Sequence, residues 1–247
     1  MSSMASKIIP YLRKSLYVIS IVIVFVILLL LRKNQQHQIC THIKIVIDAP
    51  VQRQLITQEI IKDKLDKWYI GGLSGVSQNS ISLSDIEEKL ENIPAIKEAE
   101  VSFDLKGELK IDILQHVPLV RFMPPNQKSF YLADDLVKIP SFDVDIARVP
   151  VVNDHLSHEM IKKVYTLSTY VHENAFIDAI TEQIFVNKGD LIIIPKINNQ
   201  KIVIGDTTDI PAKFDKLIDF YVDGLNHIGW DKYRIINLKY KNQIVCK

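Results

Sequence analysis

The apolar positions of this chain fall into distinct patterns, and the first is a continuous run near the N-terminus. Residues 16–31, LYVISIVIVFVILLLL, carry no charge and are bracketed by basic pairs. As a helix this run would span about 24 Å, and flanking lysine and arginine stems can extend it toward a hydrocarbon core of about 30 Å. The run has no polar face and no small-residue cleavage site, which disfavours a core helix and a removed signal peptide. We therefore expect a single transmembrane signal anchor at 16–31.

Three basic residues, Lys7, Arg13 and Lys14, precede this run, and two, Arg32 and Lys33, directly follow it. The positive-inside bias therefore favours a short cytoplasmic tail at residues 1–15. The bulk of the chain, beyond about residue 34, would then lie outside the cytoplasm.

Between residues 40 and 118 the pattern switches between strand and helix periods. Apolar and polar residues alternate over 43–47, which is typical of a strand with one buried face. Helical spacing follows over 57–68 and again in SDIEEKLENIP, where Ser84 and Glu87 could form a capping box.

Two further alternating runs, AEVSFDL and ELKIDILQ, surround a Lys-Gly turn and predict a β-hairpin. Six apolar side chains of this hairpin are expected to face the helices: Val101, Phe103, Leu105, Leu109, Ile111 and Ile113. The predicted order is strand, helix, helix, strand, strand, an arrangement that packs two helices on one face of a small sheet.

A second unit is predicted at residues 128–247, after a proline-containing link at 123–127. Short alternating runs predict an antiparallel-dominated sheet, and helical spacing over 157–172 and 210–226 predicts two helices that pack on it. The fold class is therefore α+β.

The chain closes with INLKYKNQIVCK, in which residues 236–240 alternate as a strand and apolar residues resume after a polar interruption. A terminal strand is often an edge strand, with unpaired N–H and C=O groups that a partner can use. The other interpretation is that Ile236, Leu238 and Tyr240 are ordinary core residues.

Charge and cysteine content narrow the function classes. The chain has 30 basic and 29 acidic residues, a net charge of +1, and no long basic run, so no nucleic-acid partner is expected. Cys40 and Cys246 are the two cysteines, and their spacing cannot build a zinc site of the CxxC type. Free thiols are the simpler interpretation, and a disulfide in an oxidising compartment is the alternative.

The sequence gives only weak signals for catalytic residues. His155, His158 and Glu159 follow the order H-x-x-H-E, which matches no zinc-protease motif and lies at an expected helix start. Asp134 and Asp135 lie between two apolar runs, where acidic residues usually form a turn. The sequence contains no nucleophile-elbow, P-loop or dinucleotide motif. We therefore expect a non-enzymatic protein without catalytic residues, cofactor, metal or small-molecule substrate.

The order of these segments resembles a known family. The anchor and the β-α-α-β-β unit are similar to a membrane-anchored POTRA domain, with the likeness carried by residues 92–122. Further on, FYLADDLVKIP, VPVVND, IVIGD and INLKY resemble successive segments of the bacterial cell-division family FtsQ/DivIB. Asn237 and Lys239 depart from the family's "IDLRY" strand, where aspartate and arginine are usual.

The resemblance implies a scaffold of the division machinery in the bacterial inner membrane, located at the septum. It also implies that FtsB and FtsL bind the C-terminal strand, with FtsK and FtsW as further candidate partners. The partner-binding residues expected on this basis are Leu238, Tyr240, Lys241, Asn242, Gln243, Ile244 and Val245, with Tyr240 as the anchor. Because POTRA modules are widely reused, a factor for protein transport or outer-membrane assembly is the alternative function.

Overall fold

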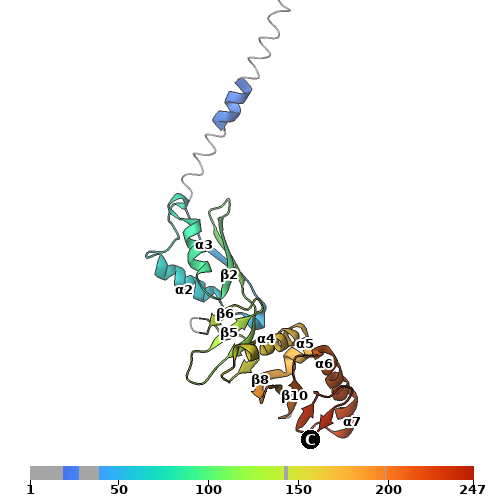
Figure 1. The fold of residues 1–247 in the computed structure, drawn as a ribbon. Helices are drawn as coiled ribbons and strands as arrows, with labels where there is room; N and C mark the ends of the chain where they lie inside the picture. The colour runs from blue at the N-terminus through green and yellow to red at the C-terminus, as the bar shows by residue number, and fades with distance from the viewer. Residues whose placement is uncertain (1–18, 28–38, 142–143, 198) are drawn as a thin grey trace, which may run out of the picture.

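The computed structural model of the chain describes residues 19–27, 39–141, 144–197 and 199–247. Between residues 39 and 247 these form a three-stranded and a nine-stranded sheet. The two sheets follow one another along an elongated molecule, and the C-terminus lies at the far end (Figure 1).

Part of the predicted anchor is described. Residues 19–27 form a helix whose apolar side chains are exposed. The rest of the predicted anchor, at 16–18 and 28–31, and the predicted tail at 1–15 lie outside the described residues. Among the described residues, no helix has the length and apolar character needed to cross a membrane.

The three-stranded sheet has the order β1-β3-β2, with β1 parallel and β2 antiparallel to β3. Its strands are β1 (Ile43–Asp48), β2 (Ile96–Phe103) and β3 (Leu109–Gln115). Its helices are η1 (Val51–Arg53), α2 (Gln58–Trp68), η2 (Gln78–Ser80) and α3 (Leu83–Glu91). The predicted order of strand, helix, helix, strand, strand is confirmed, and the helices and the sheet share one apolar core.

Helix α3 begins two residues earlier than the predicted capping box requires. The N-cap is Ser82, whose hydroxyl accepts a hydrogen bond from the Asp85 N–H at 3.3 Å. Ser84 therefore lies inside the helix, and the prediction that it caps α3 is wrong. Glu87 has a different role, because its carboxylate accepts the backbone N–H of Val101 in β2 at 2.9 Å.

The predicted core of the β2–β3 hairpin is largely confirmed. Four of the six positions are buried: Val101, Leu109, Ile111 and Ile113. Phe103 is half-buried against this core, whereas Leu105 is 89% exposed and was wrongly predicted. The strand ends before Leu105 because the Asp104 carboxylate accepts the backbone N–H groups of Lys106 and Glu108, both at 2.8 Å, and closes the turn.

The nine-stranded sheet has the order β12-β11-β10-β9-β8-β7-β4-β5-β6. Five of its strand pairs are antiparallel and three are parallel, so the sheet is antiparallel-dominated as predicted. Its strands are β4 (Pro118–Phe122), β5 (Phe130–Ala133), β6 (Lys138–Pro140), β7 (Val151–Val152), β8 (Thr181–Asn187), β9 (Asp190–Pro195), β10 (Lys201–Gly205), β11 (Ile235–Asn237) and β12 (Val245–Cys246).

Helices pack against this sheet and share a second core with it. They are α4 (His158–Glu173), α5 (Ala175–Ile180), α6 (Ile210–Asp219), the π-helix η3 (Phe220–Leu225) and α7 (Asn226–Ile228). The two predicted helices correspond to α4 and to the continuous α6–η3–α7 segment.

The two sheets meet without the predicted link. Residues 123–127 lie between β4 and β5, two paired strands of the larger sheet, so the C-terminal unit begins at Pro118 and not at residue 128. At the junction the Arg53 side chain is buried, and its guanidinium donates to the Pro118 carbonyl and to the Asp178 carboxylate, both at 2.6 Å. Residues of both units therefore meet in direct contact.

Candidate partner-binding edge at the C-terminus

The last two strands form a short hairpin at one end of the nine-stranded sheet. β12 pairs antiparallel with β11, with Ile236 opposite Cys246, and no described strand lies beyond β12. The strand predicted over 236–240 is therefore too long, because β11 ends at Asn237 and the chain turns back near Asn242. Asn242 has a φ of 59°, a left-handed conformation that asparagine tolerates in turns.

The outer side of β12 carries free backbone groups. Ile235 and Lys247 exchange two hydrogen bonds, at 2.9 and 3.0 Å. Hydrogen-bonding direction alternates along an antiparallel strand. The N–H and C=O of Val245 therefore face β11, and those of Cys246 face away from it. The edge available for pairing is thus centred on Cys246.

One lysine of helix α6 holds the chain between the two strands. The Lys216 ammonium donates to the carbonyl oxygen of Tyr240 at 2.7 Å and lies 3.5 Å from those of Leu238 and Gln243. A single cation thus serves three carbonyl groups of the β11–β12 connection. We call Lys216 and these three carbonyls the carbonyl latch.

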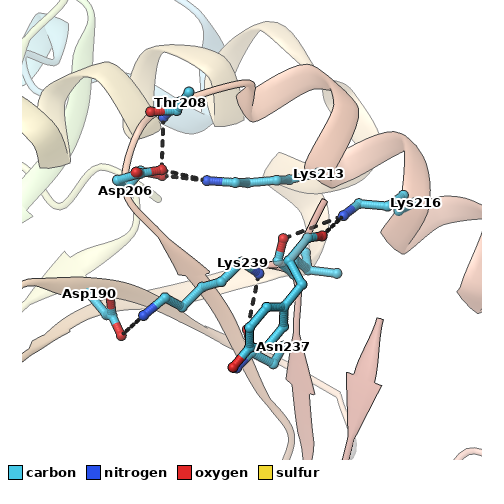
Figure 2. A network of polar contacts seen from close by, with 9 residues as sticks. Asp190, Asp206, Thr208, Lys213, Lys216, Asn237 and Lys239 are labelled. Carbon is cyan, nitrogen blue, oxygen red and sulfur yellow. Dashed lines mark hydrogen bonds and ion pairs between the residues drawn. The ribbon is translucent and has the colours of Figure 1, made fainter. Parts of the chain in front are cut away.

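The start of α6 is fixed by a second lysine. Lys213 is buried and donates to the side-chain and backbone oxygens of Asp206, at 2.8 and 2.9 Å. The same carboxylate accepts the N–H of Thr208 at 3.1 Å (Figure 2). The hydrogen bond from Lys213, followed by that from Thr208, holds the pKa of Asp206 below its usual value.

A third lysine ties the connection to the sheet. The Lys239 ammonium lies 2.8 Å from the Asp190 carboxylate, and this hydrogen bond raises the pKa of Lys239 (Figure 2). The Lys239 stem crosses Gly205, where an added Cβ would lie 2.6 Å from the Lys239 Cγ. Gly205 also has a φ of 79°, so the position favours glycine on both grounds.

A shallow groove of about 360 Å³ lies between the start of α6 and residues 238–242.

Comparison with known families identifies both units of the chain. The model for FtsQ/DivIB, C-terminal related, matches residues 117–247, which is more than half of the chain, and the model for a POTRA-like domain matches residues 38–114. The chain belongs to the FtsQ/DivIB family. A search of curated proteins gives no match.

The FtsQ/DivIB match makes this a cell-division protein, and the domains of that family are typically non-enzymatic. The two matched ranges meet at residues 114–117, close to the junction between the sheets. The resemblance to this family is therefore confirmed.

The structure separates the seven predicted partner-binding residues into three groups. Leu238 is fully buried, as is Ile236, so the core interpretation is correct for these two. Ile244 and Val245 are half-buried at the edge strand. The exposed residues are Tyr240, Lys241, Asn242 and Gln243. Lys241 and Asn242 form the turn, so they are wrongly assigned to a pairing edge.

Sequence reasoning missed three residues that shape this edge: Lys213, Lys216 and Gly205. The pattern around α6 predicts a helix, but nothing local shows that Lys216 reaches a segment 24 residues away. Cys246, whose backbone faces outward, was also left out of the predicted set.

The other candidate residues form no metal-binding cluster in the described part of the chain. No group of three metal-ligating side chains occurs among the described residues. Asp134 and Asp135 lie in the β5–β6 turn, as expected, and the Asp135 carboxylate lies 2.7 Å from the Nδ1 of His116. Cys40 and Cys246 are free, and burial raises the pKa of both thiols.

Proposed function

We propose that this chain is a non-enzymatic, single-pass scaffold of the division machinery in the bacterial inner membrane. The FtsQ/DivIB family supports a role in cell division, and the apolar run at 16–31 supports an anchor with its N-terminus in the cytoplasm. The rest of the chain would then act outside the cytoplasm, at the septum, where it would hold partner proteins together.

The observation that supports partner binding is the free outer side of β12, a strand that the carbonyl latch holds in place. An extended partner segment can add to such an edge, with main-chain hydrogen bonds for affinity and side-chain pockets for specificity. Tyr240 is 48% exposed next to this edge and offers a large, rigid contact. The FtsB–FtsL pair is the proposed occupant, with FtsK and FtsW as candidates for contacts elsewhere on the chain.

The test uses the direction of the backbone in β12. Cys246→Pro removes an outward N–H that the partner needs, while the ladder to β11 stays intact. We expect about tenfold or greater loss of affinity for FtsB–FtsL, measured with the purified full-length chain. Cys246→Ala, which keeps the N–H, serves as the matched control and should bind as the parent does.

Equal binding by Cys246→Pro and Cys246→Ala would exclude pairing at this edge. Val245→Pro is a poor test, because the N–H of Val245 faces β11 and its loss would detach the strand itself.

The POTRA-like match also suits a factor for protein transport or outer-membrane assembly. Depletion in the host separates the two functions. Long, undivided cells are expected for the division role, and normal septa with defective outer-membrane assembly would favour the alternative.

A further inference from the structure

The described sheets have four edge strands, and three of them are short or covered. β6 has three residues and ends at a proline, and β12 has two residues. On β2 the carboxylates of Glu87 and Glu91 accept the N–H groups of Val101 and Ala99, at 2.9 and 3.3 Å. Six-residue β1 is the long edge that remains, and a wide groove runs along it.

The free backbone groups of β1 can be assigned from its pairing. Leu109 donates to the carbonyl of His42, and Ile43 lies opposite Leu109 in the parallel register. Residues 44, 46 and 48 therefore face β3, and the backbone groups of residues 43, 45 and 47 face outward. Among these, the Ile45 carbonyl accepts the exposed amide of Gln58 at 2.9 Å, a contact that a flexible side chain can give up.

The side chains beside this edge are self-complementary. Lys44, Val46 and Asp48 all lie on the exposed face of β1, and Val46 is 40% exposed. If two copies pair antiparallel about Val46, Val46 meets its counterpart, and Lys44 of each copy meets Asp48 of the other. Ile45 of each copy then exchanges hydrogen bonds with Ile47 of the other, and both residues have their backbone groups outward.

We propose that β1 pairs antiparallel with β1 of a second copy of this chain, in the register centred on Val46. The pairing joins two three-stranded sheets into one of six strands. The contacts between Val46 side chains and between Lys44 and Asp48 fall at non-hydrogen-bonded positions, where opposing side chains are closest. β12 takes no part, so this inference does not depend on the proposed function.

The antiparallel direction has a geometric consequence. The two chains enter β1 from opposite ends of the paired strands. Two copies anchored in one membrane can therefore pair in this way when the paired strands lie along the membrane surface.

A charge swap tests the register. Lys44→Asp and Asp48→Lys each place like charges opposite one another at two sites, so each variant should self-associate about tenfold or more weakly. An equimolar mixture of the two restores both ion pairs, as does the double variant, and both should associate like the parent. Sedimentation equilibrium of the full-length chain in non-ionic detergent measures this. Lys188→Asp, a charge reversal at an exposed residue in the β8–β9 turn of the larger sheet, is the control.

Cysteine cross-linking provides an independent measurement. In a Cys246→Ser background, Val46→Cys should form a disulfide dimer under mild oxidation, because opposing Cβ atoms lie about 4.5–5.5 Å apart. Lys44→Cys should not, because its counterpart lies about 13 Å away along the strand. A monomeric parent, equal cross-linking by both variants, or a mixture that stays monomeric would overturn the proposal.

Discussion

Lys216 shows how much one side chain can determine at the C-terminal edge. Three carbonyl groups of the β11–β12 connection converge on its ammonium. A carbonyl group without a donor must find water, and a cation satisfies several carbonyls at once. The direction in which β12 leaves the turn therefore depends on a residue of another element.

Lys216→Met tests this dependence, since methionine keeps the apolar stem and removes the cation. We expect a loss of about 1 kcal/mol in the free energy of unfolding and faster amide hydrogen exchange over residues 238–246. Lys241→Met is the matched control, because Lys241 is exposed in the adjoining turn. Unchanged exchange in Lys216→Met would show that the connection holds its shape without the latch.

At the scale of elements, the three-stranded sheet is organised around β3. β1 and β2 pair on either side of it, and Ile111 at its centre is fully buried. The contrast with Leu105, exposed in the turn of the same hairpin, shows that alternation along a strand predicts burial only as far as the strand continues.

The stability lost when a side chain of this hairpin is truncated should increase with the burial of that side chain. Ile111→Ala should destabilise the protein by about 2–5 kcal/mol, because it leaves a cavity in the core. Phe103→Ala should cost less than full burial of a phenylalanine implies, since that side chain is half-buried, and Leu105→Ala should cost nothing measurable. Thermal melting of the three variants gives the ranking, and a large effect of Leu105→Ala would contradict the hairpin boundary.

The order of elements in both units could be predicted from periodicity and from the family resemblance, and so could most of the core. Local pattern could not show where β11 ends, because the left-handed turn at Asn242 competes with a strand that alternation alone would continue. It also could not show Lys216 reaching across from α6, which is a long-range contact between residues with unremarkable neighbours. The paired prolines at 124 and 125 suggested a link, whereas they lie between two paired strands of one sheet.

At the scale of the whole molecule, the contacts at the junction between the two sheets join the two units. Besides Arg53, the backbone N–H groups of Asp145 and Arg148, between β6 and β7 of the larger unit, donate to the carbonyls of Leu55 and Gln52 in the smaller unit, at 2.7 and 2.8 Å. Tyr131 and Ile139 of the larger sheet belong to the same buried core as the helices of the smaller unit. The two units therefore share both polar and apolar contacts.

Arg53→Met should weaken the junction. The Pro118 carbonyl and the Asp178 carboxylate would lose their donor, and because Asp178 keeps 27% side-chain exposure we expect about 3 kcal/mol, the lower end for breaking a buried ion pair. Calorimetry of the full-length chain should show one cooperative transition for the parent and a lower, broader one for the variant. Two separate transitions in the parent would contradict a shared core.

The shared core also has a mechanical consequence. Because the described parts of the two units share a core and the Arg53 contacts, we expect the separation between the start of β1 and the edge at β12 to stay nearly constant. A partner strand added at β12 would then stay at a set distance from the start of β1. A force applied to that strand would be transmitted through the junction to the three-stranded sheet.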